Sequence, residues 1–559
     1  MRVADYIAKF LIKNKVDDIF MLTGYGSMYM NDAIHINKIR HIAPRNEATA
    51  PVMAIGYSKI KKNIGVVCVT AGPGSTNALP GLAEAYVESA PVFIISGQVE
   101  RKFTSSSIGL NLRTYGTAEI NIIKFVENHT KYSSYIDDPK LIKYELEKAL
   151  YYCLEGRPGP VWLDIPLDVQ SSLIDEKNIE SFYRPKEKKE VSLDKNLDKI
   201  IRKLKNSKKP LIVFGNGVKL SGTIDHFYKI CKKSHIPFCF TRFSHDLIPY
   251  SDKNNLGLLG EKGQRYSKII FEETDFVLSL GSRLSPTFTG ENYNFFFPNA
   301  DVAIVDIDKA ELEKFDSKKV SIKVNSDLKD FLPLFKNKIQ KVKLNYNSWL
   351  NSVQLIKNKY PMLTRAMAGN PIDLYNFMSN LDKCSDKNCI LVTDAGSNYY
   401  IGGQAWCFEK GQREISSTSN AAMGISLPLA IGSAVADKSK TILAVTGDGS
   451  IELNIQELKT MSHYNLNIKL FVINNGGYAS MRNWQDNFGE NRRLDTDDLT
   501  GVGTLNFKDI AKAFSLDFEI IEHSEKIIPK IKKIIKKKGP CLIEVVTKLD
   551  QLITIPYEL

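Results

Sequence analysis

The chain has 559 residues, 43% of them hydrophobic and 25% charged, which is the ordinary composition of a soluble globular protein. Its length predicts about three domains. The longest apolar runs are strand-sized and interrupted, so we expect neither a membrane span nor a membrane partner.

Charge and cysteine content exclude further classes of protein. The net charge of +12 comes largely from lysines spread over predicted linkers and surface helices, such as residues 186–189 and 532–538. A solvated lysine-rich surface is therefore favoured over a nucleic-acid site, and weak attraction of anionic substrates stays open. The eight cysteines form no CxxC pair, and the first twenty residues lack the apolar block of a signal peptide. We expect reduced thiols and a cytoplasmic protein.

The N-terminal part predicts a parallel, doubly wound α/β domain that runs from residue 1 to about residue 171. Two glycine turns, at residues 24–26 and 71–77, follow apolar strands. Neither turn has the GxGxxG spacing of a dinucleotide fingerprint. Strands are expected at residues 18–22, 39–44, 65–70 and 91–97.

A middle domain is expected over residues 190–340, after a charged linker, and a third domain over residues 361–559. The middle domain again alternates helical and strand patterns, without an evident nucleotide fingerprint. Its strands are expected at residues 210–215, 236–241, 275–281 and 301–308.

The most informative stretch lies at residues 441–485. An apolar strand ends in a glycine turn that carries Asp448, an amphipathic helix follows, and a second apolar strand ends in the sequence NNGG at 474–477. This is a βαβ unit, and open α/β sheets bind ligands at the carboxyl ends of their strands. Asp448 and Asn475 offer the hard oxygen ligands that Mg²⁺ takes together with phosphate oxygens, and the glycines let backbone N–H groups approach a diphosphate.

The motif GDGS at residues 447–450, followed by NN at 474–475, resembles the thiamine diphosphate motif of the acetolactate synthase and pyruvate oxidase superfamily. The resemblance implies thiamine diphosphate and Mg²⁺ as cofactors. It also implies three doubly wound parallel-sheet domains, which are pyrimidine-binding, central and diphosphate-binding. The other stretches that carry it are residues 70–99, 156–170, 394–400 and 419–434.

Glu47 is the catalytic residue that the resemblance implies. By itself, a glutamate at the start of an apolar helix is explained by the helix dipole. In the family, a glutamate in this context donates to the pyrimidine of the cofactor, and such a group should be sheltered from water. The resemblance places the metal ion on Asp448, Asn475 and the backbone carbonyl of Gly477. It implies cofactor contacts at Gly26, Gly72, Asn77, Ser397, Asn398, Ala421, Met423, Gly447, Gly449, Ser450, Gly477, Tyr478 and Ala479.

Departures from the acetolactate synthase pattern lie where a second substrate should bind, whereas the cofactor residues are kept. The family's lysine is Leu167 here, one glycine of the first loop is Tyr25, and two glycines follow Asn475. We therefore expect thiamine chemistry with an altered donor or acceptor. Substrate contacts are expected at Tyr25, Arg113, Tyr399, Arg482, Trp484 and Gln485.

The expected activity is a carboligation that transfers a two-carbon unit from a 2-keto acid such as pyruvate to a carbonyl acceptor. Residues 476–485 resemble the loop of relatives from bacterial surface-sugar clusters, which makes a keto-sugar nucleotide a candidate acceptor. Decarboxylation of a 2-keto acid and cleavage of a hydroxyketone or dione stay open as alternatives. An inactive binding or regulatory homologue is disfavoured, because Glu47 and Asp448 are both present.

The ligand of the middle domain and the assembly are further expectations. The segments that carry FAD in flavin-containing relatives are present with changed side chains, so FAD and a structural spacer with a vacant or adenine-nucleotide site both stay open. In the family, the glutamate of the first domain meets the metal site of the third domain across a dimer interface. We therefore expect a homodimer or a homotetramer. The FAD segments match residues 215–217, 260–263, 283 and 306–308.

Overall fold

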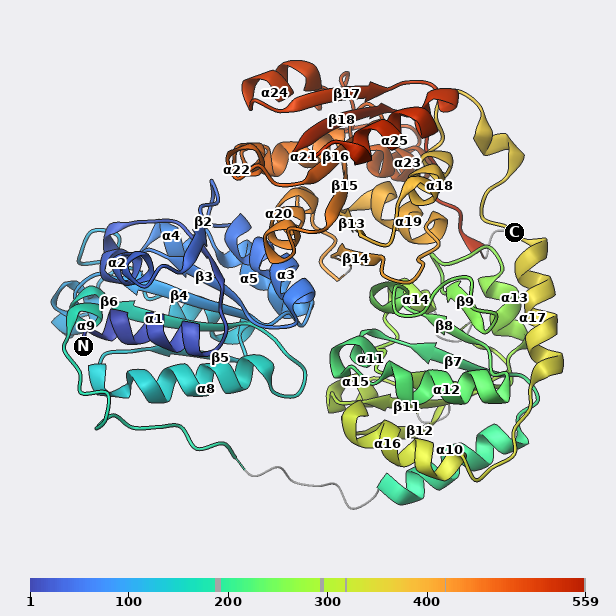
Figure 1. Ribbon diagram of the computed structural model, residues 1–559, viewed down its shortest axis with the longest axis horizontal. Coiled ribbons are helices and arrows are strands. Elements are labelled where there is room, and N and C mark those ends of the chain that lie inside the picture. Colours follow the sequence, from blue (N-terminus) through green and yellow to red (C-terminus); the bar gives the residue numbers. More distant parts are fainter. Residues whose placement is uncertain (186–192, 292–295, 317–318, 418, 557–559) are drawn as a thin grey trace.

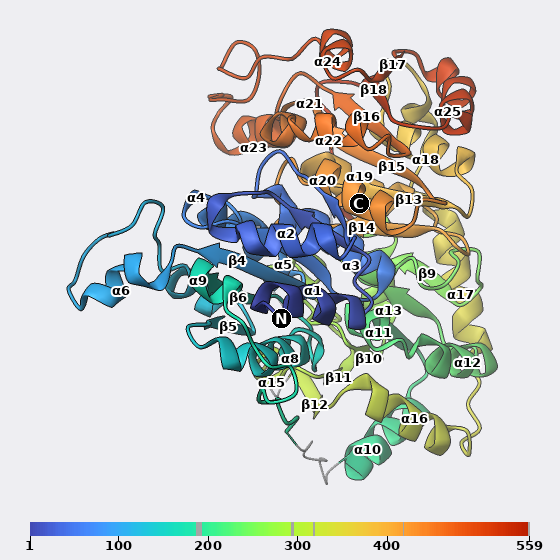
Figure 2. The same cartoon turned by 60° about the vertical axis from the view of Figure 1, so that its left-hand side comes forward.

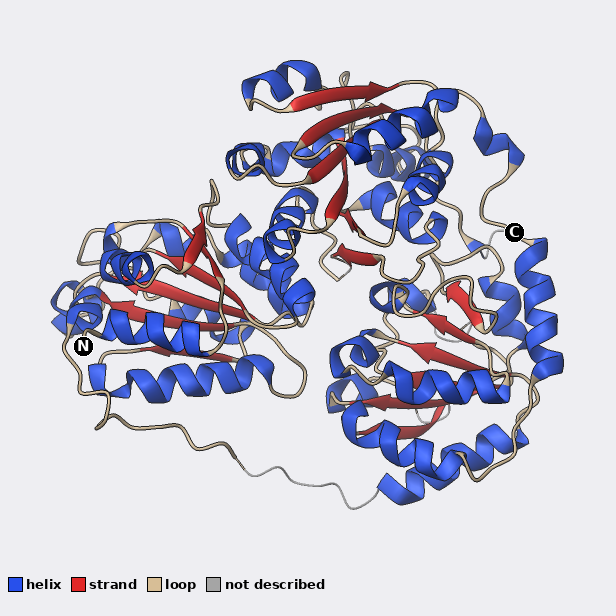
Figure 3. Cartoon of the chain, viewed as in Figure 1, coloured by secondary structure: helices blue, strands red, loops and turns tan. Residues whose placement is uncertain are grey.

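The computed structural model describes residues 1–185, 193–291, 296–316, 319–417 and 419–556, which form three α/β lobes (Figure 1). Each lobe holds a six-stranded sheet whose neighbouring strands are parallel. Helices lie on both faces of the sheets (Figure 3), so the expected class of three doubly wound α/β units is confirmed. Among the described residues, no helix is long and apolar enough to cross a membrane.

The sheet of the N-terminal lobe has the strand order β2-β1-β3-β4-β6-β5. One face is covered by α1 (Val3–Lys13), α2 (Met28–Ile36) and α8 (Ile142–Leu154). The other face is covered by α3 (Thr49–Lys61) and α5 (Leu79–Val87), whose core continues into the C-terminal lobe. The strands are β1 (Asp18–Met21), β2 (Arg40–Ile42), β3 (Gly65–Val69), β4 (Val92–Gln98), β5 (Tyr132–Tyr135) and β6 (Val161–Pro166).

An arm projects from this lobe between β4 and β5 and carries α6 (Ser105–Ile108) near its tip (Figure 2). The buried carboxylate of Glu119 holds the arm together, because it accepts hydrogen bonds from the backbone N–H groups of Ser105 (3.1 Å) and Tyr115 (3.2 Å). The base of the arm packs on the second glycine turn, where a Cβ added at Gly72 would lie 2.7 Å from the carbonyl oxygen of Ala118.

The sheet of the central lobe has the order β12-β11-β10-β7-β8-β9. All four expected strands are present, and two edge strands that the sequence pattern did not indicate, β9 and β12, complete the sheet. The expected first residue of this domain, 190, lies outside the described residues. The strands are β7 (Pro210–Phe214), β8 (Phe238–Phe240), β9 (Asn255–Leu258), β10 (Phe276–Leu280), β11 (Asp301–Asp306) and β12 (Val320–Asn325). The main helices are α10 (Leu193–Asn206), α12 (Ile224–Ser234), α13 (Ser267–Glu273), α16 (Leu328–Ile339) and α17 (Asn347–Lys359).

The sheet of the C-terminal lobe has the order β14-β13-β15-β16-β18-β17. Strands β15 and β16 are in register from the pair Ile442–Ile468 to the pair Gly447–Ile473, so their carboxyl ends lie at the same edge. The strands are β13 (Cys389–Thr393), β14 (Arg413–Ser416), β15 (Thr441–Gly447), β16 (Ile468–Asn474), β17 (Asp517–Ile521) and β18 (Cys541–Val546). The main helices are α18 (Leu374–Cys384), α19 (Gly396–Ala405), α20 (Ser426–Ala436), α22 (Glu457–His463), α23 (Ala479–Phe488) and α25 (Ile527–Lys536).

The single helix expected between β15 and β16 is broken. Its path consists of α21 (Asp448–Ile451), the short 3-10 helix η7 (Glu452–Asn454) and α22. The crossover still returns the chain to a parallel neighbouring strand, so the βαβ unit is present as expected.

The N-terminal and C-terminal lobes dock through α3 and α20, which lie against each other (Figure 1). Glycines allow the close approach: a Cβ at Gly56 would overlap the carbonyl oxygen of Leu429, and a Cβ at Gly432 would overlap that of Met53. The helix that follows Glu47 is thereby fixed to the lobe that carries Asp448.

Candidate active site

Asp448 is the centre of a buried polar cluster at the carboxyl ends of β15 and β16. Its side chain is 1% exposed. Oδ2 accepts the N–H groups of Asn475 (3.1 Å) and Gly477 (2.9 Å), and Oδ1 accepts the N–H of Gly449 (2.9 Å). Burial raises the pKa of Asp448 above its ordinary value, against the opposing effect of these hydrogen bonds. A cation at this carboxylate would offset the cost of burial.

The donor set around Asp448 fits a divalent cation. Asn475 Oδ1 is buried and has no hydrogen-bond partner among the described residues. The Gly477 carbonyl accepts only a 3.2 Å bond from Ala479 N among the described backbone bonds, which leaves it a second lone pair. A carboxylate, an amide oxygen and a backbone carbonyl are the hard oxygen ligands that Mg²⁺ prefers.

Glycines bring the backbone close on both sides of this cluster. A Cβ at Gly449 would overlap the ring of Tyr478, and a Cβ at Gly477, whose φ is +105°, would lie 2.5 Å from the carbonyl oxygen of Thr496. The N–H of Tyr478 donates to the same Thr496 oxygen at 2.9 Å. The turn that ends in Ala479 therefore packs tightly onto the loop around residue 496.

Asp394, directly after β13, is a site residue that our sequence analysis missed. Its Oδ2 accepts the hydroxyls of Thr446 and Ser450, both at 2.7 Å, and burial raises its pKa to about 6. Asp394 Oδ1 and Asn398 Oδ1 are both buried without a hydrogen-bond partner among the described residues. An acid that immediately follows an apolar strand was the available signal.

The expected contacts Ser397, Asn398 and Ser450 thus lie with Asp394 at the ends of β13 and β15. Ser397 Oγ lies 3.3 Å from Ser480 Oγ, on the helix that follows the Asn475 turn. The segment with Ala421 and Met423 is joined to the same corner, because Gly424 N donates to Ser450 Oγ at 2.8 Å. Ala421 is exposed with φ +51°, and Met423 is half-buried. Gly447 is the last residue of β15.

Glu47 belongs to a second cluster, on the N-terminal lobe. Asn77 Nδ2 donates to Glu47 Oε2 at 3.1 Å, and a Cβ at Gly74 would lie 3.6 Å from Glu47 Oε1. The turn of Gly26 packs on the same region, since a Cβ there would lie 2.8 Å from Ala71 Cβ. Glu47 is half-buried in the single subunit, which is less shelter than we expected.

Glu457, on α22, ties the two clusters together, and our sequence analysis missed it as well. Its fully buried carboxylate accepts the N–H of Arg45 (2.8 Å) and the hydroxyls of Thr49 (2.9 Å) and Thr460 (2.7 Å). Burial raises its pKa above the ordinary value. The C-terminal lobe therefore holds the loop that carries Glu47. Among the described residues, no hydrogen bond joins Glu47 directly to the Asp448 cluster.

The six expected substrate residues do not form one group. Tyr25 and Trp484 are 66% and 56% exposed, and Arg113 is exposed on the arm. The Gln485 amide pairs with the backbone of Leu494, donating at 3.1 Å and accepting at 2.9 Å.

The two other members of this set already have partners within the fold. Arg482 is 5% exposed, and its Nη groups donate to four backbone carbonyls, so it is not free to clamp a substrate anion. The guanidinium carbon of Arg242 lies over the Tyr399 ring, 4.3 Å from the ring centre, and Tyr399 lines a pocket between the lobes.

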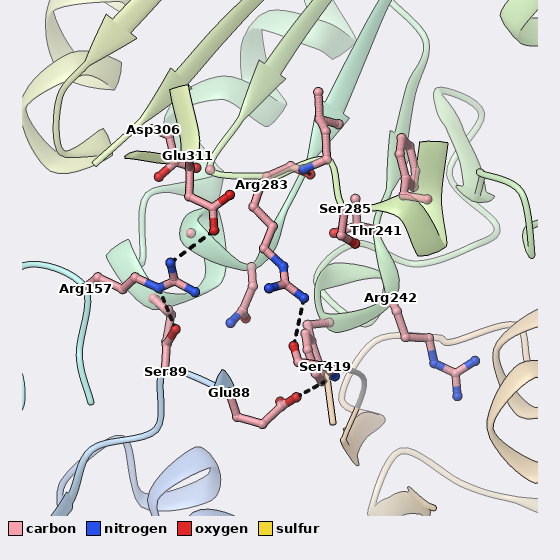
Figure 4. A pocket seen from close by; sticks show the side chains of 18 of the residues that line it. Glu88, Ser89, Arg157, Thr241, Arg242, Arg283, Ser285, Asp306, Glu311 and Ser419 are labelled. Atoms are coloured by element: carbon pink, nitrogen blue, oxygen red, sulfur yellow. Dashed lines mark hydrogen bonds and ion pairs between the residues drawn. The ribbon is translucent and has the colours of Figure 1, made fainter. Parts of the chain in front are cut away.

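This pocket has a volume of about 230 Å³ and lies where the three lobes meet (Figure 4). Arg157 of the N-terminal lobe donates to Ser89 Oγ at 2.8 Å and pairs with Asp308 at 2.9 Å, and Arg283 donates to Ser419 Oγ at 2.9 Å. Residues from all four segments expected to contact FAD line it, among them Asn216, Gly217, Lys262, Arg283, Asp306 and Ile307. Burial raises the pKa of Asp306 at the end of β11.

Comparisons with known proteins match the chain along most of its length. Models of the thiamine pyrophosphate enzyme N-terminal binding domain, central domain and C-terminal binding domain match residues 1–125, 197–334 and 394–545. The acetolactate synthase large subunit of Lactococcus lactis is 32% identical over 95% of this chain and 90% of its own length. The chloroplastic acetolactate synthase of Arabidopsis thaliana is 29% identical over 88% of this chain and 73% of its own length. The acetolactate synthase isozyme 1 large subunit of Escherichia coli is 28% identical over 97% and 93%.

Proposed function

Because this chain belongs to the thiamine pyrophosphate enzymes and is an enzyme of the acetolactate synthase type, we propose that it joins a two-carbon unit from a 2-keto acid such as pyruvate to a carbonyl acceptor. The observation that carries this proposal is the cluster of Asp448, Asn475 and Gly477, whose buried oxygens fit a magnesium ion bound to a diphosphate. The identities of the donor and of the acceptor are themselves part of the proposal.

Each residue of the C-terminal cluster has a proposed task. Asp448, the Asn475 side chain and the Gly477 carbonyl would hold Mg²⁺, and the missing side chain of Gly449 lets the Tyr478 ring pack against the same turn. The remaining expected contacts of this lobe flank the cofactor: Ser397, Asn398, Ala421, Met423, Gly447, Ser450, Tyr478 and Ala479. When bound, thiamine diphosphate supplies the electron sink for breaking the bond beside the keto group.

Glu47 is the proposed acid–base residue. It would hold a proton at the pyrimidine of the cofactor, while Asn77 orients its carboxylate and the turns of Gly26 and Gly72 would flank the cofactor. The Glu457 clamp on Arg45 and Thr49 supports this role, because it fixes the loop of Glu47 at both ends.

We also propose that two subunits complete each site, in a homodimer or a dimer of dimers. Glu47 is half-buried in one subunit, although its chemistry requires shelter from water. Large apolar side chains are exposed around both halves of the site, including Tyr25 (66%), Trp484 (56%), Phe488 (73%) and Leu499 (96%). Exposed apolar surface of this kind is typical of protein interfaces.

The acceptor can be identified by mass spectrometry. The purified protein, with thiamine diphosphate and Mg²⁺, is screened against 2-keto acids with and without keto-sugar nucleotides. We expect CO₂ from pyruvate and an acceptor adduct heavier by C₂H₄O. A free aldehyde as the only product besides CO₂ would make the protein a 2-keto acid decarboxylase, and cleavage of a hydroxyketone or dione supplied in place of the keto acid would make it a lyase for such substrates. A cofactor-loaded protein that converts nothing would favour the inactive homologue.

A second proposal concerns the pocket between the lobes, which we infer to be a nucleotide site, with FAD as the ligand implied by the family resemblance. Arg157, Lys262 and Arg283 supply positive charge for phosphates, and Asp306 at the end of β11 is placed to accept ribose hydroxyls. The visible spectrum of the purified protein and chromatography of its acid extract test this. A colourless protein that releases no nucleotide would leave the central lobe a structural spacer.

Domain roles and location complete the proposal. We assign pyrimidine binding to residues 1–171, the central domain to residues 190–340 and diphosphate and metal binding to residues 361–559, a division that the three matched family models support. All eight cysteines are free, which supports a reducing, cytoplasmic location.

A further inference from the structure

The guanidinium of Arg482 lies beneath the turn that carries the proposed metal ligands. Arg482 is on α23 and is 5% exposed. Its Nη1 donates to the carbonyl oxygens of Gly476 (2.7 Å) and Thr496 (3.0 Å), and its Nη2 donates to those of Asn475 (2.5 Å) and Leu549 (2.8 Å). One side chain therefore joins the metal-binding turn, the loop around residue 496 and the segment after β18.

The peptide unit between Gly476 and Gly477 is held at both of its polar ends. Its carbonyl oxygen accepts from Arg482 Nη1, and its N–H, on the opposite side of the trans peptide, donates to Asp448 Oδ2 at 2.9 Å. Both glycines have positive φ, +71° and +105°. Glycine populates positive and negative φ about equally readily, so the glycines alone do not fix the orientation of this peptide unit. The two hydrogen bonds at opposite ends of this peptide unit restrict it to one orientation.

A buried guanidinium with four carbonyl partners is costly, which argues against an incidental contact. Burial lowers the pKa of Arg482, and the charge of nearby Asp448 counteracts this effect. Four of the five N–H donors of the guanidinium are committed to backbone oxygens. The side chain thus acts on the fold of the turn rather than on a ligand in the entrance.

We propose that Arg482 is a positioning residue for cofactor binding: it fixes the Gly476–Gly477 peptide so that the Asn475 side chain and the Gly477 carbonyl face the metal ion before the ion arrives. The inference rests on the proposed function, because it assigns Arg482 to the same metal site. It predicts that the turn is already ordered in the protein free of cofactor.

The test uses the full-length protein with R482Q, R482K and the control R492Q. Arg492 lies in the same region, is exposed and pairs only with Glu490 among the described residues, so R492Q removes an equal charge without touching the turn. The Kd of thiamine diphosphate is measured by calorimetry at saturating Mg²⁺. Hydrogen exchange of residues 474–479 is measured in the cofactor-free protein.

We expect R482Q to raise the Kd about tenfold or more, since hydrogen bonds from a charged donor are lost and a mobile turn must be ordered on binding. Exchange at Gly477 should become faster in the same variant. R482K keeps the charge but cannot span both pairs of carbonyls, so its Kd should lie between the Kd of the wild type and the Kd of R482Q. The Kd of R492Q should match that of the wild type. If R482Q does not fold, R482K carries the test with the same criteria.

Wild-type Kd and wild-type exchange in R482Q or R482K would overturn the inference. So would an unchanged Kd with a raised KM for the 2-keto acid, because that pattern identifies a substrate clamp. A wild-type protein that binds no thiamine diphosphate at all would instead overturn the proposed function, and the inference with it.

Discussion

Single carboxylates organise the site through backbone N–H groups. Asp448 accepts three of them, and Glu457 accepts the N–H of Arg45 together with two hydroxyls. Backbone donors cannot rotate away as side chains do, so such a carboxylate fixes the loops that meet at it. The two glycine-rich strand ends and the Glu47 loop are each fixed in this way.

The first prediction concerns Asp448→Asn. In one orientation the new amide would turn its NH₂ group toward the N–H groups of Asn475 and Gly477, so donors would face donors. In the flipped orientation its oxygen could accept from them, but the negative charge opposite the metal ion would still be lost. We expect Mg²⁺-dependent binding of thiamine diphosphate to weaken at least about tenfold. Isothermal calorimetry measures this. The exposed acid Glu452, four residues on, gives the control Glu452→Gln, and equal affinities in the two variants would remove Asp448 from the metal site.

The second prediction concerns Asp164, an acid buried in β6. Its Oδ1 accepts from Ser96 Oγ (2.6 Å) and its Oδ2 from Gln98 Nε2 (3.2 Å), and burial raises its pKa from 3.8 to about 7. Because the folded pKa is the higher one, its contribution to stability is complete below about pH 4 and is lost as the pH rises to about 7. The loss is at most about 4 kcal/mol, from about 1.4 kcal/mol per pH unit.

Asp164→Asn removes this titration, since the amide can accept from Gln98 and donate to the Ser96 hydroxyl. The thermal midpoint of the variant, relative to the wild type, should rise between pH 4 and pH 8 by roughly 3 °C. Differential scanning fluorimetry across this range measures the difference. A difference that stays constant with pH would show that Asp164 titrates normally in the folded protein.

At this scale the sequence reveals residue types but not their partners. Asp448 and Asn475 were predicted to meet because both directly follow strands of one βαβ unit, and the register of β15 with β16 brings them together. The partners of Arg482 could not be predicted, because an arginine near a loop looks the same in the sequence whether it faces solvent or four carbonyls. Glu457 was missed because only the tertiary contact with the Glu47 loop distinguishes it from an ordinary helical glutamate.

Between elements, the contact of α3 with α20 governs how Glu47 is presented. The helices approach so closely at Gly56 and Gly432 that carbonyl oxygens occupy the space of a Cβ. Their apolar residues belong to one core with the sheets of both terminal lobes. The position of the Glu47 loop is therefore linked to the packing of two lobes, not of one.

The third prediction is that Gly432→Ala separates these helices. A Cβ there overlaps the Met53 carbonyl, so the backbone must shift, at a cost of roughly 1 to 3 kcal/mol that exceeds the gain in helix propensity. We expect a lower thermal midpoint, and lower turnover because the Glu47 loop moves with α3. Gly369→Ala is the control, since nothing lies within 4 Å of a Cβ at that position. Equal behaviour of the two variants would contradict the packing argument.

The sequence pattern gives the limits of several buried strands well, but it did not indicate the interior strands β6, β13 and β18, nor most edge strands. The apolar runs of β3, β10, β15 and β16 end within about two residues of their predicted limits. In contrast, β9 and β12 lie at the edges of the central sheet, and β12 alternates buried and less buried positions. Without a continuous apolar run, such strands are identified only by the neighbours that pair with them.

Across the whole molecule, the half-buried Glu47 and the exposed apolar residues around both clusters are the observations that support the proposal of a site shared by two subunits. From the sequence, the two clusters could be related only through the family resemblance, because their positions depend on docking of lobes and of subunits. The fourth prediction is that Glu47→Gln and Asp448→Asn chains complement each other. A mixed dimer then has one site in which both residues are intact.

Mixing the two inactive chains during refolding or co-expression should restore up to about a quarter of the wild-type activity, because half of the dimers are mixed and each has one intact site. Each variant alone serves as the control, and light scattering reports the assembly state. An inactive mixture of well-folded dimers would place both residues of a site in one chain.

The most direct test of the account is CO₂ release from pyruvate, with the carbonyl acceptors of the mass-spectrometric screen present, by the wild-type and Glu47→Gln proteins, each shown beforehand to bind thiamine diphosphate and Mg²⁺. We predict steady release by the wild type, dependent on both cofactors, and none above background from the variant at the same cofactor occupancy. Undiminished release by the variant would contradict the role of Glu47. A fully loaded wild-type protein that leaves pyruvate and every other 2-keto acid unchanged would contradict the proposed reaction.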